Sequence, residues 1–345
     1  LGAMEVWSPH IAKAVLWQIS GHYEHYRDKM FIWEQEGEEW GLKAMNCPMH
    51  IMIYKFRPRS YRDLPIRYAE FATVYRKEQS GELHGLARVW SLTQDDHHFY
   101  VREDQLEDEL MKIFEAAKEV YDLFGFDYRV KLSTRPEKAM GSKEIWDKAE
   151  GILKDILEKL GIEYEIKEKE GAFYGPKIDI DVRDSMGRWW QLTTIQVDFG
   201  MPERFKMSYV DKDGSKKRPV IIHFAILGSL ERFMAVLIEH TKGRLPFWLA
   251  PVQVKVLPVS DAQLKYAQEV HNLLKRADIR VELDSEGTLA KRIRKAEVEK
   301  VACIVVVGNK EKKAREVNVR GIGNMKLEDF IKKAKRAKEE RKWSI

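Results

Sequence analysis

After residue 250, short apolar runs alternate with segments whose apolar residues recur at helical spacing. The runs predict strands and the segments predict helices. The predicted strands are 252–259, 280–283, 302–307 and 316–319, and the predicted helices are 261–276 with Asp261 as N-cap, 289–300 and 327–342. Strands that alternate with helices in this way are typical of an α/β domain built on a mixed sheet.

Before residue 250, predicted strands often follow one another without a helix between them. The predicted strands are 67–75, 87–93, 177–182 and 189–199, and the predicted helices are 104–124 and 142–160. This order favours a largely antiparallel sheet flanked by helices, an α+β fold. Two prolines bracket the apolar segment LPFWLAP, so we expect one domain at residues 1–247 and a smaller one at 248–345.

Composition narrows the class of protein. The chain has 345 residues, 44% hydrophobic and 33% charged, which is enough for two folded domains and excludes a disordered or fibrous protein. No apolar stretch reaches the ~18–20 residues that span a bilayer, so we expect no membrane contact. The only cysteines are Cys47 and Cys303, which excludes a disulfide framework and favours a cytoplasmic location.

The net charge of +5 is unevenly distributed along the chain. Residues 250–345 carry 23 Lys and Arg against 14 Asp and Glu, whereas the first 249 residues carry 37 against 41. A basic C-terminal part beside a slightly acidic larger part is typical of a module that binds a polyanion such as nucleic acid. Solubility of a small domain is the alternative explanation, and charge alone leaves both open.

Phosphate recognition, if it occurs, must rely on side chains. The sequence contains no GxxxxGK[ST] loop and no GxGxxG after a predicted strand. Arginine binds phosphate through its planar fork, and two arginines occupy informative places. Arg76 follows the run YAEFATVY, and Arg232 lies in HFAILGSLERF, where Gly228 and Ser229 end an apolar strand before a helix. Taken singly, each arginine is better explained as an ordinary surface residue than as a ligand contact, and spacing alone does not decide between the two.

Nitrogen and sulfur donors suitable for zinc are scattered rather than grouped. They are Cys47, His50, His97, His98 and His223. None forms a CxxC pair, an HExxH or another compact ligand motif. Spacing therefore leaves two hypotheses open, buried packing and a zinc site.

Several ordered blocks, considered together, resemble the class II aminoacyl-tRNA synthetases, and among them the threonyl-tRNA synthetases. The blocks are LKAMNCPMHI, YRDLPIRYAEFATVYRKEQSGELHGLARV, LTQDDHHFY, KLSTRPEKAMGS, EGAFYGPKIDI, VDF, HFAILGSLERF and WLAPVQVKVLPVSD. The resemblance implies a catalytic domain on an antiparallel sheet followed by an anticodon-binding domain. It also implies a threonine–tRNA ligase that makes threonyl-adenylate from L-threonine and ATP and transfers threonine to the 3′ end of tRNA(Thr).

The resemblance assigns the ATP site residue by residue. Arg76 matches the arginine that binds the α-phosphate, and Arg232 matches the arginine that stacks on adenine; these two are the expected catalytic residues. Glu78 matches the acid that contacts the adenine amino group, and Arg88 matches the arginine on the γ-phosphate. Softer matches in the ATP site are Gln191, Thr194 and Ser229. Mg²⁺ is expected with ATP, because it bridges phosphate oxygens.

The resemblance also assigns one zinc ion per chain and the amino-acid pocket. Cys47, His98 and His223 match the three zinc ligands, while His97 is expected not to be a ligand. Zinc with an open position would recognise the amino and hydroxyl groups of threonine, which valine cannot offer as a pair. Asp96 matches the acceptor for the substrate hydroxyl. The other matches in the amino-acid pocket are Gln94, Tyr174, Lys177 and Gln196.

Further expectations concern partners. Glu311 and Arg320 match positions that contact the tRNA anticodon, and a homodimer is expected. No editing domain is recognised in these residues, so a separate protein that edits seryl-tRNA is a possible partner. A non-catalytic tRNA-binding paralogue of the same fold remains the alternative function.

The match departs from the family pattern at several positions. Leu92 stands where an aromatic residue faces adenine, and Phe224 stands where an arginine usually follows the zinc histidine. Pro9 resembles the motif 1 proline, but the long interface helix expected before it is absent. The chain also looks short between Arg320 and Gly321.

Overall fold

The computed structural model describes residues 1–345. The chain divides into two compact units, Leu1–Val236 and Leu237–Ile345. Helix α7 (Leu230–His240) passes from one to the other. The predicted boundary between residues 247 and 248 lies further along the chain and stays a prediction. None of the helices has both the length and the apolar character needed to cross a membrane.

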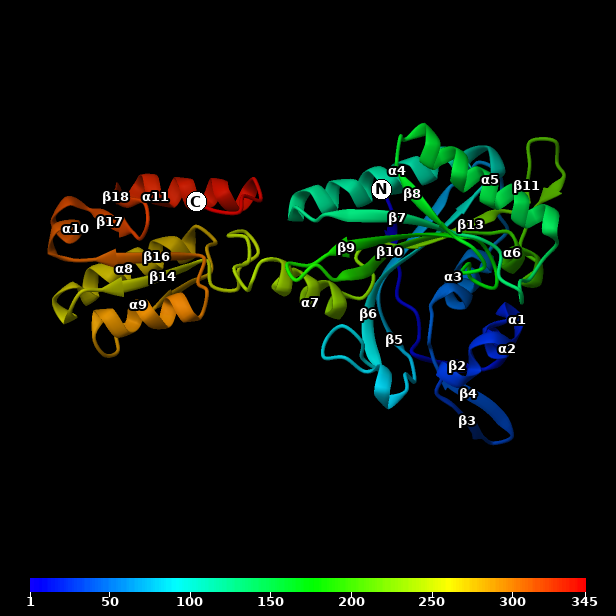
Figure 1. The fold of residues 1–345 in the computed structure, drawn as a ribbon, viewed down its shortest axis with the longest axis horizontal. Coiled ribbons are helices and arrows are strands. Elements are labelled where there is room, and N and C mark those ends of the chain that lie inside the picture. Colours follow the sequence, from blue (N-terminus) through cyan, green and yellow to red (C-terminus); the bar gives the residue numbers. More distant parts are fainter. The chain divides into compact units, whose positions relative to one another are not determined.

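An eight-stranded sheet forms the centre of the N-terminal unit (Figure 1). Its strand order is β1-β5-β6-β13-β10-β9-β7-β8, and all neighbours pair antiparallel except β1 with β5 and β7 with β8 at the two edges. The strands are β1 (Met4–Glu5), β5 (Ile66–Tyr75), β6 (Ser91–Val101), β13 (Val220–Ala225), β10 (Trp189–Asp198), β9 (Lys177–Arg183), β7 (Tyr128–Ser133) and β8 (Tyr164–Lys167). The predicted antiparallel α+β fold is confirmed.

Helices cover both faces of this sheet. On one face, α4 (Leu106–Phe124) buries residues three to four positions apart, and the Tyr121 hydroxyl hydrogen bonds to Thr193 of β10. On the other face, α3 (Cys47–Lys55) packs Ile51 and Tyr54 against apolar residues of β5 and β6. The remaining elements are α1 (Val15–Ser20), α2 (His22–Tyr26), α5 (Lys143–Lys159), α6 (Gly200–Arg204), β2 (Ile11–Lys13), β3 (Ile32–Gln35), β4 (Glu38–Leu42), β11 (Tyr209–Val210) and β12 (Lys216–Lys217).

The C-terminal unit is an α/β domain with a mixed five-stranded sheet. The strand order is β15-β14-β16-β17-β18; the first three strands are parallel and the last two pairings are antiparallel. One apolar cluster, which includes Val256, Val305 and Phe330, forms its core. The elements are β14 (Val254–Pro258), α8 (Leu264–Arg276), β15 (Val281–Leu283), α9 (Leu289–Val298), β16 (Cys303–Val307), α10 (Asn309–Ala314), β17 (Glu316–Val319), β18 (Gly323–Lys326) and α11 (Leu327–Glu339).

Two local predictions are wrong. Residues 87–90 are not part of a strand, because β6 begins only at Ser91, after a turn in which His84 pairs with Arg88. Asp261 is not the N-cap of the following helix: the Ser260 hydroxyl and the Gln263 side chain form the capping box, and Asp261 starts a short 3-10 turn.

After Arg320 the chain closes tightly, with Gly321 at φ 84°, a left-handed conformation that glycine adopts readily.

Candidate functional site

Residues from four strands form a row across one face of the central sheet. His98 of β6 lies opposite His223 of β13, His223 lies opposite Gln196 of β10, and Gln196 lies opposite Lys177 of β9. Directly paired residues point to the same face of a sheet. Side chains from distant parts of the sequence therefore share one surface.

Cys47 completes a cluster of donors on this surface. It begins helix α3, and its Sγ lies with one nitrogen each of His98 and His223, all three atoms within 4.8 Å of one another. All three side chains are buried. Burial raises the pKa of the Cys47 thiol well above its usual value, and burial together with His223 and His50 lowers the pKa of His98. A buried Cys/His/His set with its donor atoms this close together fits the ligand chemistry of zinc.

Neighbouring acids hold two side chains of this region. The Asp198 carboxylate lies 3.1 Å from His223 Nε2, so that imidazole presents Nδ1 to the cluster. The Asn46 amide donates to Asp96 at 2.8 Å. Asp96 itself is 7% exposed and lies opposite Glu70, which places an acceptor close to the cluster on the same face.

A pocket of about 220 Å³ lies beside the cluster and brings together the predicted ATP-site residues. Its lining includes Arg76, Glu78, Arg88, Leu92, Gln94, Gln191, Thr194, Ser229 and Arg232. These residues come from the connection between β5 and β6, from β6 and β10, and from the start of α7 with the residue before it. All seven residues predicted to bind ATP therefore lie around one cavity.

Two arginines of the pocket are held by the backbone. Arg232 donates from Nε to the Ala87 carbonyl at 2.9 Å and from Nη1 to the Gln191 carbonyl at 3.1 Å. Arg76 donates to the Ala44 carbonyl at 3.3 Å. Burial, and then the charges of Arg88 and Arg76, lower the pKa of Arg232. Because these cations repel one another, an anion in the pocket would be stabilised.

Glu78 has a partner that the sequence analysis did not identify. Lys29 donates to its carboxylate at 2.7 Å, and this hydrogen bond raises the pKa of Lys29. Lys29 and Tyr26 also line the pocket. No sequence motif marks either residue: Tyr26 ends α2 and Lys29 follows it, both far along the chain from the strands of the site. Leu92, the departure from an aromatic residue, lines the pocket with an aliphatic side chain.

His22 is a further residue that the sequence analysis missed. Its Nε2 lies 4.0 Å from Cys47 Sγ, and its Nδ1 lies 2.7 Å from the Ser20 hydroxyl. Burial and the neighbouring His223 lower the pKa of His22 to about 3. The imidazole is therefore neutral at physiological pH. The segment SGHYEHY contains His22 and His25 but matches no compact ligand motif, so spacing gave no signal for His22.

A hydrogen bond and an ion pair hold three further predicted substrate residues, Tyr174, Gln196 and Lys177. The Tyr174 hydroxyl donates to Gln196 Oε1 at 2.6 Å, and its ring centroid lies 5.2 Å from that of His223. Lys177 forms an ion pair with Asp179. Asp179 also accepts from Gln191 at 2.7 Å and from Thr194 at 2.9 Å. A single carboxylate thus orients polar groups between the cluster and the arginine pocket.

The structure accounts for the departure at Phe224. It pairs with His97 across β13 and β6, and the two rings stack with centroids 4.4 Å apart. Side chains alternate between sheet faces, so both rings point away from His98 and His223. His97 accordingly lies outside the donor cluster.

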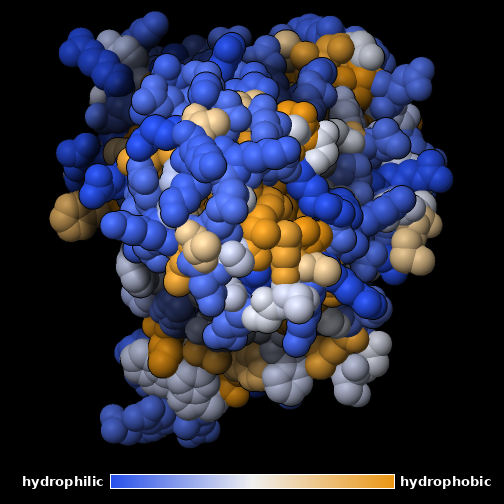
Figure 2. Space-filling model, turned by 90° about the vertical axis from the view of Figure 1, so that its left-hand side faces the viewer, coloured by the Kyte–Doolittle hydropathy of each residue, from blue (hydrophilic) through white to orange (hydrophobic).

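The predicted anticodon residues lie on different elements of the C-terminal unit. Glu311 of α10 accepts from the Gly308 amide at 2.8 Å and so caps its own helix. Arg320 follows β17 and forms an ion pair with Glu297 at 2.7 Å, with half of its side chain exposed. Hydrophilic side chains dominate the face shown in Figure 2, with a smaller apolar area near its centre.

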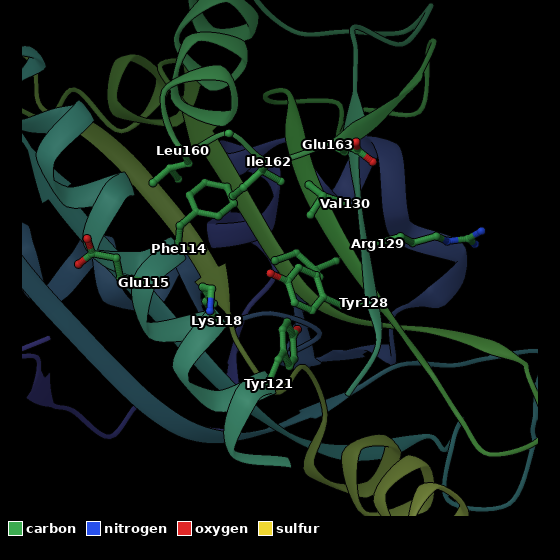
Figure 3. Close-up of a pocket in the computed structure, with 12 residues that line it drawn as sticks. Phe114, Glu115, Lys118, Tyr121, Tyr128, Arg129, Val130, Leu160, Ile162 and Glu163 are labelled. Atoms are coloured by element: carbon green, nitrogen blue, oxygen red, sulfur yellow. The ribbon is translucent and has the colours of Figure 1, made fainter. Parts of the chain in front are cut away.

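A separate hollow of about 420 Å³ lies between α4, the end of α5 and strand β7 (Figure 3). Its apolar floor includes Phe114, Val130 and Ile180. Ile180 alternates with Asp179 along β9, so this hollow opens on the opposite face of the sheet from the donor cluster. It contains none of the predicted site residues.

Comparison with known proteins identifies both units. Residues 29–241 match the class II tRNA synthetase core domain of the G, H, P, S and T group, and residues 253–336 match an anticodon-binding domain. Catalytic subunits of threonine–tRNA ligase from Sulfurisphaera tokodaii and Sulfolobus acidocaldarius are each 54% identical over 96% and 95% of this chain. The chain spans 63% and 60% of the length of those relatives.

Solved structures agree with this assignment. The RNA-binding domain of threonyl-tRNA synthetase from Cryptosporidium parvum aligns with a TM-score of 0.89 and 41% identity, covering 97% of this chain and 86% of that one. A threonyl-tRNA synthetase described from Aeropyrum pernix aligns with a TM-score of 0.84 and 32% identity, covering 99% and 82%. The chain therefore belongs to the threonyl-tRNA synthetase family of class II aminoacyl-tRNA synthetases.

Proposed function

We propose that this protein is a threonine–tRNA ligase. It activates L-threonine with ATP to give threonyl-adenylate and pyrophosphate, and it then transfers threonine to the 3′ end of tRNA(Thr). The observation that carries this proposal is the adjacency of two sites on one sheet face: the pocket of Arg76, Arg88 and Arg232, and the cluster of Cys47, His98 and His223. The arginine pocket suits a nucleoside triphosphate, and the donor cluster suits a small amino acid.

The arginine pocket serves the activation step. Displacement at the α-phosphate needs alignment of the reactants and stabilisation of developing negative charge more than it needs proton transfer. Arg76 and Arg232 enter the pocket already fixed by backbone carbonyls, so little reorganisation is required when ATP binds. Mg²⁺ bound with ATP would add neutralisation of the phosphate oxygens.

The donor cluster serves amino-acid selection. Zinc held by Cys47, His98 and His223 would supply a Lewis-acid position that recognises an amino group and a hydroxyl group together. Asp96, fixed by Asn46, accepts the hydrogen bond of the substrate hydroxyl. Valine lacks that hydroxyl, and an apolar pocket alone would reject it by only ~1–3 kcal/mol. Serine carries both groups, so we keep a separate editing protein as a predicted partner.

Threonine-dependent exchange of pyrophosphate into ATP tests the proposal. We expect exchange with threonine, far less with valine, and measurable exchange with serine. Zinc content of the same preparation is measured by atomic absorption. A zinc-loaded protein that binds tRNA but shows no exchange with any amino acid would instead support a non-catalytic tRNA-binding paralogue.

We also propose that the ligase works as a homodimer in the cytoplasm. Large apolar side chains gather around one hollow of the N-terminal unit, and several are strongly exposed: Trp7 at 86%, Phe56 at 88% and Met4 at 54%. Exposed apolar patches of this kind mark protein interfaces. Sedimentation of the wild type and of Phe56→Asp tests the dimer, and a wild-type protein that sediments as a monomer would contradict it.

A further inference from the structure

His50 lies behind the donor cluster and has both ring nitrogens engaged. It follows Cys47 by three positions on helix α3, so one turn of helix carries both side chains on nearly the same side. Its Nδ1 lies 2.8 Å from His98 Nδ1, and its Nε2 lies 2.9 Å from the Glu70 carboxylate. The His50 side chain is 0% exposed. Bulk solvent therefore does not reach this ring, and each of its nitrogens has a partner within the protein.

These two contacts determine where the protons lie. The Glu70 carboxylate only accepts, so His50 Nε2 must donate to it. A neutral His50 then has a lone pair at Nδ1, which accepts the proton of His98 Nδ1. That hydrogen bond leaves the lone pair of His98 on Nε2, the nitrogen that can bind a metal. The order of donors thus prepares His98 as a ligand.

Glu70 is held as an anion at the far end of this chain. Lys43 Nζ donates to its Oε1 at 3.0 Å, and Ser8 donates from its amide at 3.1 Å and from its hydroxyl at 2.8 Å. Burial raises the pKa of Glu70, but hydrogen bonds from His50, Ser8 and Lys43 outweigh this effect and lower it to about 2. The Glu70 carboxylate therefore lies ready to accept the hydrogen bond from His50 Nε2.

We propose that His50 is a positioning residue for the metal site, and that Lys43, Glu70 and His50 form a directed relay that fixes the tautomer and ring orientation of His98. This inference rests on the proposed zinc site. A simple packing role would be the competing explanation, because a buried Lys–Glu pair next to a histidine also needs neutralisation. The two explanations differ in which nitrogen of His50 matters.

Two substitutions separate the nitrogens. Asparagine places its amide near the Nδ1 position and can accept from His98, whereas glutamine places its amide near the Nε2 position and can donate to Glu70. If His50 positions the metal ligand, His50→Gln raises the zinc dissociation constant about 10- to 100-fold, the usual effect of losing such a partner. His50→Asn should retain most of the affinity. If His50 serves only to pack against and neutralise the Lys43–Glu70 pair, His50→Gln keeps the contact with Glu70 and should retain the zinc affinity, whereas His50→Asn should lose it.

Zinc affinity is measured by competition with a chromophoric chelator, and ligand geometry by the visible absorption of the cobalt-substituted protein. We expect the cobalt spectrum of His50→Gln to change and that of His50→Asn to resemble the wild type. His97→Gln is the matched control, because His97 lies on the opposite face of the sheet and should leave both readouts unchanged. Thermal unfolding of the metal-free variants reports folding separately from metal binding.

The outcomes distinguish the two proposals. A wild type that binds no zinc would contradict the metal site itself, and the relay with it. A wild type that binds zinc, together with His50→Gln that binds it equally well and with the same spectrum, would overturn the relay alone. A loss of affinity in His50→Asn but not in His50→Gln would also overturn it.

Discussion

Arg232 is oriented before any substrate arrives, because the carbonyl oxygens of Ala87 and Gln191 accept two of its guanidinium protons. Burial, and then the nearby charges of Arg88 and Arg76, lower the pKa of this guanidinium. Three arginines therefore lie together in the pocket where we propose that the phosphates of ATP bind. The question for each residue of this pocket is whether its charge is enough or whether the shape of its side chain is also needed.

Arg232→Lys should show that shape matters as well as charge. A lysine keeps the positive charge but has no planar fork to satisfy both carbonyls. We expect threonine-dependent pyrophosphate exchange to fall on the order of 100- to 1,000-fold, with an unchanged unfolding temperature. Arg218→Lys is the control, since Arg218 is exposed and pairs only with Glu203. Full activity of Arg232→Lys would show that charge alone suffices.

Cys47→Ala should separate catalytic rate from amino-acid selection. The substitution removes one of three donors, so zinc retained after dialysis should fall sharply. Selection of threonine over valine should then decline toward the roughly 10- to 200-fold limit of an apolar pocket. Exchange rates with both amino acids and zinc content are measured on the same preparation. Selectivity that survives the loss of zinc would refute the role of the metal.

At the scale of elements, the β9–β10 hairpin positions Asp179, Gln191 and Thr194, and its turn depends on Asp184. Asp184 accepts from the amides of Met186 and Arg188, from the Arg188 side chain and from the Trp190 indole. Burial raises the pKa of Asp184, but these hydrogen bonds outweigh it and lower the pKa to about 2. The turn is therefore stabilised by the ionised carboxylate.

Asp184→Asn should reveal the pH range of that stabilisation. Because the folded pKa lies below the unfolded value, the contribution is complete above the unfolded pKa and is lost as pH falls toward the folded pKa of about 2. We expect the substitution to cost about 1–2 kcal/mol in urea unfolding at pH 7. The difference from the wild type should shrink progressively below about pH 4. Tryptophan fluorescence reports this, since eight of the ten tryptophans lie in Leu1–Val236. A cost that is independent of pH would assign the effect to packing.

Elements with a strong hydrophobic period were predictable from the sequence, and elements defined by long-range contacts were not. Helix α5 and strand β9 agree with their predicted ranges within a residue or two. Helix α10 and strand β18 were missed, because α10 is short and polar and β18 is defined by pairing with β17 rather than by apolar residues. The donor cluster likewise has no local pattern, since β6 and β13 bring His98 and His223 together. The family resemblance supplied what spacing could not.

At the scale of the whole molecule, the charge difference along the chain corresponds to the division of tasks that we propose for the two units. The N-terminal unit holds its few important cations inside a pocket, whereas the last 96 residues expose many of their 23 cations to solvent. Charges inside a pocket select a small anion, and charges on a surface attract an extended one. Activation of threonine and recognition of tRNA should therefore respond separately to substitution.

Arg320→Ala tests this separation. Arg320 matches an anticodon-contacting position, and its ion pair with Glu297 is exposed, so losing it should cost the fold at most about 1 kcal/mol. We expect pyrophosphate exchange to remain at the wild-type rate, because exchange does not involve tRNA. The kcat/KM of tRNA charging should fall roughly 10- to 100-fold, the scale of one lost arginine contact to a base. Arg276→Ala, at the exposed end of α8, is the control for loss of charge alone. Equal losses in exchange and charging would mean that the two units do not act independently, whereas unchanged charging would exclude Arg320 from anticodon recognition.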